Sequence, residues 1–529
     1  MLTEVTRRKT FAIISHPDAG KTTLTEKLLL YGGAIRLAGT VKGRKVNKYA
    51  TSDWMEIEKQ RGISVTSSVL NFDYNGYRIN ILDTPGHQDF SEDTYRTLTA
   101  ADSAVMLIDG AKGVEEQTKK LFHVCRMRKI PIFTFVNKLD RYCKNPFDLM
   151  DEIEKTLGIR SCPVNWPIGE DGAYKGVYNR KLAQIELFES EGHGQKIITS
   201  HAGSVQDERF KSLLGEHIYN KLCEDIELLD MAGEEFDMQK VLSGELTPLF
   251  FGSAMTNFGV QPFLEEFISI APSPGTRKHT DGFTAPEDSD FSGFVFKIQA
   301  NMDLAHRDRI AFIRICSGKY EKGIEVHHTR TKKSVRLSQS QQFMAQERVF
   351  IEEAYAGDII GVFDPGIFHI GDTLYGGKKS FNFEGIPMFP AEHFAYVSAK
   401  DASKRKQFLK GIQQIAEEGA IQVFKQPNIG VETLMIGVAG VLQFEVLEYR
   451  LKNEYHVDIT MQVSPYVLAR WLVTKKSPEE ISVYSGSISV VEDQYQRPVM
   501  LFKDPWTLNK AVESNKDVAF LDIAPPVVK

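Results

Sequence analysis

The sequence predicts a multidomain α/β protein, in which a domain with a parallel sheet is followed by a β-barrel domain and a ferredoxin-like α+β domain. Apolar runs of strand length alternate with helical stretches in the first half, which is typical of βαβ units and a parallel sheet. Short strands separated by glycine and aspartate predict the barrel. A strand and helix order of βαββαβ predicts the ferredoxin-like domain.

Length and composition are those of a globular protein of several domains. The chain has 529 residues, 42% of them hydrophobic and 25% charged, and its formal net charge is −6. It lacks both the apolar run of about 18 residues that a membrane helix needs and the apolar core of a signal peptide. We therefore expect a cytoplasmic protein that has no membrane contact and whose five cysteines are reduced. The negative charge argues against DNA as a partner.

The strongest local signal lies between the apolar run 11–14 and a helical stretch. It reads S-H-P-D-A-G-K-T and resembles a phosphate-binding loop, with a serine where the first glycine is usual. Backbone N–H groups of such a loop, together with the helix N-terminus, stabilise polyphosphate. Lys21 is expected to reach the β- and γ-phosphates, and Thr22 to offer its hydroxyl to Mg²⁺. The residues predicted to bind nucleotide here are Ser15, His16, Pro17, Asp18, Ala19, Gly20, Lys21 and Thr22.

A second polar loop, D-T-P-G-H, follows the apolar run 79–82. Ligands of parallel sheets sit beyond the carboxyl ends of the strands, so this loop should lie beside the first. Asp83 is expected to hold Mg²⁺ through water, and the Gly86 N–H to meet the γ-phosphate. His87 is the predicted catalytic residue, which orients the attacking water; the alternative is a solvated histidine that opens a helix. The predicted nucleotide-binding residues of this loop are Asp83, Thr84, Pro85, Gly86 and His87.

The sequence N-K-L-D follows the apolar run 132–136 and predicts recognition of guanine. The Asp140 carboxylate can accept hydrogen bonds from the N1–H and N2–H₂ groups of guanine, a donor pair that adenine lacks. Asn137 can bind guanine N7 and join neighbouring loops, and Lys138 can lay its alkyl stem over the base. After the run 248–251, G-S-A places a backbone N–H where it can meet guanine O6. The residues predicted to bind the base are Asn137, Lys138, Leu139, Asp140, Ser253 and Ala254.

The polar stretch 51–66 precedes the second strand and contains a glycine. We interpret it as a loop that the γ-phosphate and Mg²⁺ order and that hydrolysis releases. Ser64 is the favoured hydroxyl ligand of Mg²⁺. Thr66, on the same face of an extended chain, is the alternative, and an ordinary strand hydroxyl is the third possibility.

Spacing and composition predict the domain boundaries. Asp140 and Gly252 lie much farther apart than one crossover connection requires, so we expect a subdomain inserted at about residues 159–241 of the first domain, which spans 1–275. A linker containing proline and serine follows. The β-barrel domain is predicted at 290–385, and the ferredoxin-like α+β domain with a C-terminal extension at 390–529. The only chemistry that these motifs predict is that of the nucleotide site.

In this order the motifs resemble the five nucleotide signatures of the translational GTPases: S-H-P-D-A-G-K-T, R-G-I-S-V-T, D-T-P-G-H, N-K-L-D and G-S-A. The segment 394–412, F-A-Y-V-S-A-K-D-A-S-K-R-K-Q-F-L-K-G-I, is similar to bacterial members that act in translation termination. The resemblance implies a P-loop GTPase domain that binds GTP or GDP with Mg²⁺ and is stimulated by the ribosome. It also implies that the GTP-bound protein, expected to be a monomer, drives codon-specific peptide release factors off the ribosome and leaves on hydrolysis.

Three alternatives share these motifs. A translocation factor like elongation factor G has the same nucleotide site but carries two further C-terminal domains, for which we expect no room before Lys529. A GTP-gated ribosome-binding scaffold would bind nucleotide with little hydrolysis, and His87 argues against it. An ATPase is disfavoured by Asp140, which matches guanine.

Overall fold

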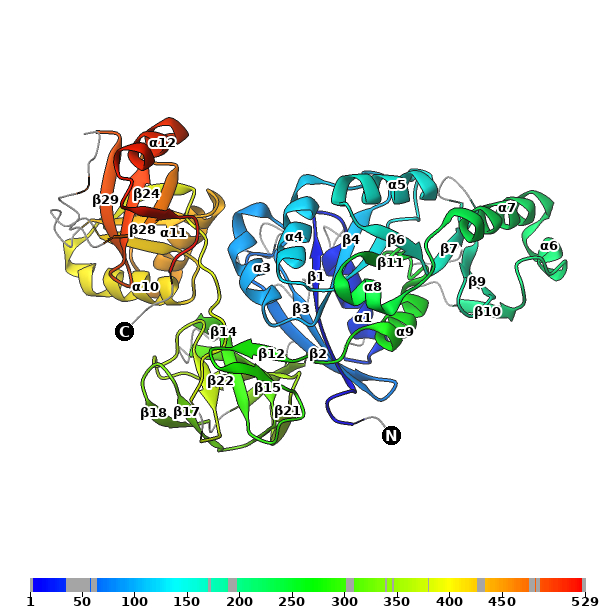
Figure 1. The fold of residues 1–529 in the computed structure, drawn as a ribbon, viewed down its shortest axis with the longest axis horizontal. Coiled ribbons are helices and arrows are strands. Elements are labelled where there is room, and N and C mark those ends of the chain that lie inside the picture. Colours follow the sequence, from blue (N-terminus) through cyan, green and yellow to red (C-terminus); the bar gives the residue numbers. More distant parts are fainter. Residues whose placement is uncertain are drawn as a thin grey trace.

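The structure of the chain is a computed structural model. It describes residues 3–34, 58, 64–169, 173–188, 197–300, 309–337, 340–344, 347–378, 380–425, 433–474, 481 and 486–525. The first domain occupies the centre of Figure 1, an inserted sheet and helix pair extend to the right, the barrel lies below, and the third domain lies to the left.

The first domain is built on a seven-stranded sheet. Its strands, in spatial order, are β2 (Ser68–Tyr74), β3 (Tyr77–Asp83), β1 (Arg8–Ser15), β4 (Ser103–Asp109), β5 (Ile132–Asn137), β11 (Leu246–Phe251) and β6 (Arg160–Pro163). All neighbouring pairs are parallel except β2 with β3. Every residue of β1, β4, β5 and β11 is buried, because helices cover both faces of a parallel sheet.

Alternate residues of β1 supply two cores on opposite faces of this sheet. Ala12 and Ile14 belong to the core that Leu98, Leu121 and Ile153 join from three helices, whereas Phe11 and Ile13 belong to the core on the other face. The helices of the first face are α3 (Ser91–Leu98), α4 (Glu116–Met127) and α5 (Pro146–Leu157), and those of the second are α1 (Lys21–Tyr31) and α9 (Val260–Ile270). Both layers are visible in Figure 1.

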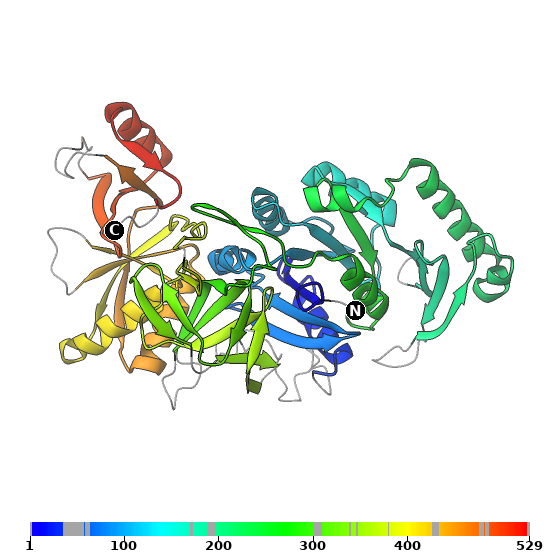
Figure 2. The same ribbon diagram turned by 60° about the horizontal axis from the view of Figure 1, so that its bottom comes forward.

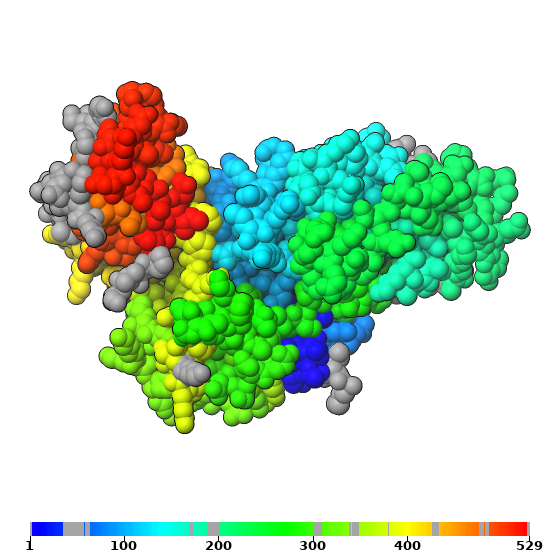
Figure 3. Space-filling model, viewed as in Figure 1, coloured from blue at the N-terminus to red at the C-terminus, as the bar shows by residue number. Residues whose placement is uncertain are grey.

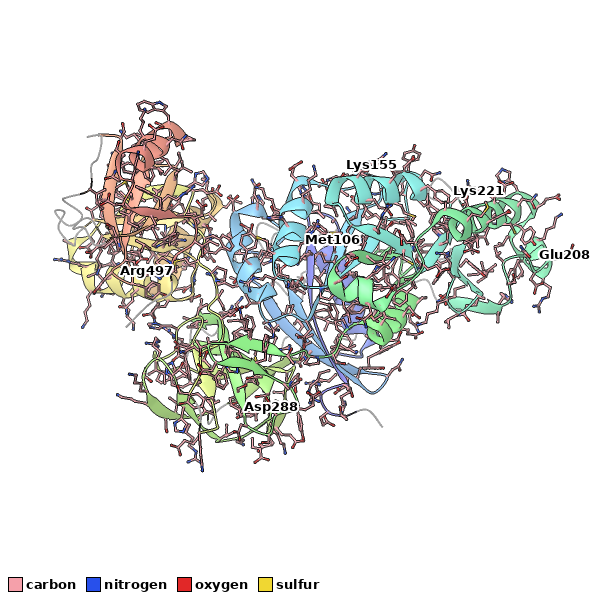
Figure 4. The ribbon with its side chains drawn as sticks, in the orientation of Figure 1. Met106, Lys155, Glu208, Lys221, Asp288 and Arg497 are labelled. Atoms are coloured by element: carbon pink, nitrogen blue, oxygen red, sulfur yellow. The ribbon has the colours of Figure 1, made fainter. Side chains whose placement is uncertain are left out.

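The segment between β6 and β11 forms a sheet of its own. Its elements are β7 (Asn165–Ile168), β8 (Gly176–Asn179), β9 (Gln184–Phe188), β10 (Ile197–Ala202), α6 (Arg209–Leu214), α7 (Glu216–Ala232) and α8 (Met238–Ser243). The Trp166 Nε1–H donates to Asp225 at 3.0 Å and so ties β7 to α7. In Figure 4, Glu208 and Lys221 mark this end of the molecule. The insertion is expected from about residue 159; β6 pairs in parallel with β11 in the main sheet, so the separate sheet begins after β6.

The second domain is β-barrel-like. Eight strands follow the order β18-β17-β23-β14-β15-β22-β19-β20, and two short pairs, β16-β21 and β12-β13, accompany them. The bounds are β12 (Arg277–His279), β13 (Gly282–Thr284), β14 (Ser292–Ala300), β15 (Arg309–Ser317), β16 (Lys319–Glu321), β17 (Glu325–His328), β18 (Lys333–Arg336), β19 (Ser340–Met344), β20 (Glu347–Phe350), β21 (Glu353–Tyr355), β22 (Ile359–Phe363) and β23 (Thr373–Tyr375). On β14, Val295 and Ile298 enter the barrel core, whereas Phe294 and Phe296 join the first-domain core.

The third domain has the predicted βαββαβ order. Its elements are β24 (His393–Ala399), η2 (Ala402–Lys404), α10 (Arg405–Glu417), β25 (Gln422–Lys425), β26 (Leu434–Val438), α11 (Leu442–Tyr455) and β27 (Ile459–Val463). The spatial order β27-β24-β26-β25 is that of a ferredoxin-like sheet. The C-terminal extension continues this sheet through β29 (Ile488–Asp493), β30 (Pro498–Phe502), β28 (Leu468–Val473) and β31 (Ala519–Leu521), and α12 (Pro505–Ser514) precedes β31.

Buried polar contacts join the domains. The Thr10 hydroxyl donates to the Gly357 carbonyl at 2.7 Å, and Arg314 pairs with Asp102 at 2.6 Å, so β1 and the residue that precedes β4 meet the barrel. The Arg96 guanidinium donates to the Gly419 carbonyl of the third domain at 3.0 Å. Figure 2 shows the barrel and the third domain beside the first domain, and Figure 3 shows their side chains in contact with it. Among the described residues, no helix has the length and apolar character needed to cross a bilayer.

Candidate functional site

The predicted phosphate-binding loop joins the end of β1 to the start of α1. Ser15 ends the strand and is buried, and Lys21 begins the helix. Gly20 has φ 98°, a left-handed conformation that costs glycine little, and a Cβ there would lie 2.3 Å from the Asn137 side-chain nitrogen. Among the described residues, neither the Ser15 hydroxyl nor His16 Nδ1 has a hydrogen-bond partner. The loop thus offers polar groups at the end of the sheet, where parallel sheets bind ligands.

Lys21 and Asp83 meet at the floor of this loop. The Lys21 ammonium lies 2.5 Å from a carboxylate oxygen of Asp83, and both side chains are buried. The Thr25 hydroxyl donates to the same oxygen at 3.3 Å. Thr22, half-buried, follows Lys21 in the first turn of α1. The structure therefore brings together the carboxylate and the ammonium predicted for Mg²⁺ and phosphate, and Thr22, which carries the predicted hydroxyl, follows Lys21 directly.

The loop after β3 runs back toward the phosphate-binding loop. The Thr84 hydroxyl donates to the Ile13 carbonyl at 2.7 Å, and the Pro85 carbonyl accepts from Thr94 at 3.3 Å. Gly86 lies against Pro17, whose Cα would be 3.6 Å from a Cβ at position 86. These contacts hold Asp83, Gly86 and the phosphate-binding loop in one arrangement.

His87 stands where this loop enters the short helix η1 (Gln88–Phe90). The imidazole Nδ1 accepts the Asp89 backbone N–H at 3.2 Å, and the side chain is 30% exposed, so the ring remains open to solvent on one side. In the neutral ring, an acceptor at Nδ1 leaves the proton on Nε2. Such a ring can donate a hydrogen bond to a water molecule.

Asn137 joins three of the predicted loops. Its side-chain N–H donates to the Ala19 carbonyl at 2.8 Å, and its side-chain oxygen accepts the Ala254 backbone N–H at 2.8 Å. The Ser253 hydroxyl donates to the exposed Asp140 carboxylate at 2.5 Å. The buried Leu139 completes the contact, since its N–H donates to the Gly252 carbonyl at 3.2 Å. All of the residues predicted to bind the base therefore lie in one cluster.

Asp109, which the motifs did not identify, supports Lys138. The Lys138 ammonium donates to the Asp18 carbonyl and to the Asp109 carboxylate, the latter at 2.9 Å, and Arg141 contacts the same carboxylate at 2.7 Å. Burial opposes ionisation of Asp109, but the hydrogen bonds from Lys138 and the Ala111 N–H outweigh burial and lower the pKa of the carboxyl group. Asp109 ends β4, so the rule that placed Asp83 and Asn137 at strand ends could have found it.

Most of the predicted loop 51–66 lies outside the described residues. In the part that is described, the Glu58 carboxylate accepts hydrogen bonds from the backbone N–H groups of Val65 and Thr66 at 2.9 and 3.1 Å. Ser64 is half-buried and directly precedes this contact. The assignment of Ser64 or Thr66 to Mg²⁺ stays a prediction.

Three family matches cover most of the chain. The Elongation factor Tu GTP binding domain family matches residues 6–273, the Elongation factor G domain 2 family matches 290–377, and the family described as Class II release factor RF3, C-terminal domain, matches 383–512. A solved structure from Thermus thermophilus has a TM-score of 0.69 at 22% identity, covers 92% of this chain and 72% of its own, and so shares the fold.

Curated relatives match along nearly the full length. Peptide chain release factor 3 of Symbiobacterium thermophilum is 59% identical over 98% of this chain and 98% of its own. The protein of the same name from Gloeobacter violaceus is 56% identical over 99% and 98% of the two chains. The chain therefore belongs to the peptide chain release factor 3 family, the translational GTPases of peptide chain termination.

Proposed function

We propose that this protein binds GTP and Mg²⁺ with the clustered loops, hydrolyses GTP when it meets the ribosome, and thereby drives codon-specific release factors off the ribosome. The hydrogen bonds of Asn137 to Ala19 and Ala254 carry this proposal, because they join the loops predicted for phosphate and for guanine. Membership of the release factor 3 family supports the place of the reaction in termination. We also propose that the protein works in the cytoplasm as a monomer.

The phosphate end of the site fits a nucleoside triphosphate with Mg²⁺. Backbone N–H groups around Gly20 and the Lys21 ammonium supply positive charge for the phosphates. The Thr22 hydroxyl and the Asp83 carboxylate are hard oxygen donors of the kind that Mg²⁺ prefers, with Asp83 acting through water. Lys21 pairs with Asp83 in this structure, so it would exchange that partner for phosphate oxygens on binding. When bound, Mg²⁺ would neutralise charge on the β- and γ-phosphates.

The base end fits guanine. Asp140 is exposed and already accepts one hydrogen bond from Ser253, which orients its carboxylate. That carboxylate would accept the N1–H and N2–H₂ groups of guanine. The Ala254 N–H would meet guanine O6, and the stem of Lys138, held by Asp109, would cover the base.

His87 would orient the attacking water. Its imidazole, held at Nδ1 by Asp89, presents Nε2 as a donor to the water oxygen, and the water then attacks the γ-phosphorus in line with the leaving group. The Gly86 N–H would contact the γ-phosphate. Ser64, or in its place Thr66, would add a hydroxyl to Mg²⁺ while GTP is bound.

A recycling assay tests this function. Purified protein, ribosomes stalled after peptide release, a labelled codon-specific release factor and GTP are mixed, and dissociation of the label is followed. We expect dissociation to speed up with GTP and GTP turnover to need ribosomes. Dissociation that is unaffected by the protein, or GTP-dependent movement of tRNA and mRNA in its place, would contradict the proposal.

A further inference from the structure

Asp89 contacts both the predicted catalytic histidine and another domain. One oxygen of its carboxylate accepts the backbone N–H of Leu442 at 2.8 Å, and Leu442 is the first residue of α11 in the third domain. The other oxygen lies 3.3 Å from His87 Nδ1, and the Asp89 backbone N–H lies 3.2 Å from the same nitrogen. A single residue therefore connects the imidazole of the GTPase domain to a helix of the third domain.

The start of α11 is built to receive this carboxylate. Val441 occupies the N-cap position of α11 and provides no side-chain hydrogen bond to the helix. The first N–H groups of a helix need acceptors, and a negative charge is favourable there, so Asp89 caps α11 from outside its domain. Gly440 permits the close approach, because a Cβ at that position would lie 2.1 Å from Asp89 Cγ.

The same helix contacts the second loop predicted to act in hydrolysis. Val65, Phe90 and Val446 form a small buried apolar cluster, to which Leu442 and Tyr449 add partly buried side chains. Val65 follows the predicted Mg²⁺ ligand Ser64, and Phe90 lies three residues after the predicted catalytic His87, so α11 packs against the two segments that carry these residues. Figure 3 shows the third domain in contact with the GTPase domain along this side.

We propose that Asp89 is a positioning residue for GTP hydrolysis, because it makes the orientation of the His87 imidazole depend on contact between α11 and the GTPase domain. The inference rests on the proposed role of His87 in orienting water. The Asp89 backbone N–H holds the ring at Nδ1, so loss of the carboxylate contact lets residue 89 and the ring shift, which lowers the rate of hydrolysis. Nucleotide affinity stays, because the loops that bind guanine are held together by Asn137 and Ser253.

Two single substitutions break this contact from opposite sides. Asp89→Ala removes the carboxylate, whereas Gly440→Ala pushes the start of α11 away while residues 87 and 89 stay unchanged. We expect each variant to lower ribosome-stimulated kcat roughly tenfold. The Kd for a fluorescent GTP analogue should stay within about twofold of the parent value. A normal kcat in both variants would overturn the inference.

A double substitution separates positioning from general damage. If Asp89 acts through His87, the variant that combines Asp89→Ala with His87→Ala should turn over GTP no more slowly than His87→Ala alone. If the loss of kcat in the double variant equals the product of the losses in the two single variants, the inference is overturned. If His87→Ala lowers kcat but Asp89→Ala does not, this inference alone is overturned. If His87→Ala leaves kcat unchanged, the proposed role of His87 is overturned as well.

Asp504→Ala is the matched control. Asp504 caps another helix of the third domain, α12, by accepting the Thr507 N–H at 2.8 Å. Its removal deletes the cap of α12 but leaves the contact between Asp89 and α11 unchanged, so we expect unchanged turnover of GTP. If Asp504→Ala slows hydrolysis as much as Asp89→Ala does, general destabilisation of the third domain explains both and the inference fails.

Discussion

The guanine end and the hydrolytic end of the site are held in different ways. At the guanine end, Asn137 and Ser253 join the loops through hydrogen bonds within the GTPase domain. At the hydrolytic end, Asp89 contacts the third domain, and the Lys297 ammonium of the barrel donates to the Ser67 carbonyl. The difference teaches that the loops predicted to bind guanine are held within one domain, whereas the segments that carry or adjoin the residues predicted for hydrolysis are held by contacts with all three domains.

The largest effect is expected from a substitution at the guanine end. Asp140→Asn exchanges an acceptor for a donor opposite guanine N1–H and N2–H₂, so the preference for GTP over xanthosine triphosphate should fall by roughly a thousandfold. Competition binding with the two nucleotides measures the change. An unaltered preference would show that Asp140 does not contact the base. Asp151→Asn, on the exposed face of α5, serves as the control.

The next largest effect concerns the hydrolytic end. His87→Ala should lower ribosome-stimulated kcat about a hundredfold or more, because the water loses its orienting donor. GTP affinity should hardly change, since the guanine end is intact. Multiple-turnover phosphate release and equilibrium binding separate the two quantities. Equal losses of kcat and affinity would contradict the division between the two ends.

A smaller effect is expected from Asn137→Ala. This change deletes both hydrogen bonds that join the loops, so affinity for GTP and GDP should fall roughly tenfold to a hundredfold. Asn165→Ala is the matched control, because buried Asn165 also bridges two segments through the Phe251 N–H at 2.7 Å but belongs to the inserted sheet. Isothermal titration and thermal unfolding of both variants compare binding with stability. Similar affinity losses would indicate general destabilisation.

The smallest effect concerns Asp109. The folded state lowers the pKa of this carboxyl group, so its stabilising contribution is present above the unfolded pKa, about 4, and is lost as the pH falls through the lower folded pKa. Asp109→Asn should therefore reduce the free energy of unfolding by about 1 kcal/mol at pH 7 and by less at pH 3. Urea unfolding at both pH values measures this. A difference that grows on acidification would contradict the assignment.

Local sequence predicted those parts of the fold in which pattern and structure coincide. The run 11–14 and its glycine-containing loop predicted β1, the turn at Gly20 and α1, because a buried strand, a left-handed glycine and a leucine-rich helix each have a local signal. The order βαββαβ predicted the third domain for the same reason. The place of β6 in the main sheet has no local signal, because β6 pairs with β11, a strand that is distant in sequence.

The sequence by itself determined the chemical groups of the site and their order, because each motif places an ammonium, hydroxyl, carboxylate or amide at a strand end. Only the tertiary structure decided that Asp109 supports Lys138, that the partners of Asn137 are Ala19 and Ala254, and that Asp89 of the GTPase domain caps α11 of the third domain. The physical reason is that a hydrogen bond depends on distance and direction between atoms, and neither is encoded locally when the partners lie hundreds of residues apart.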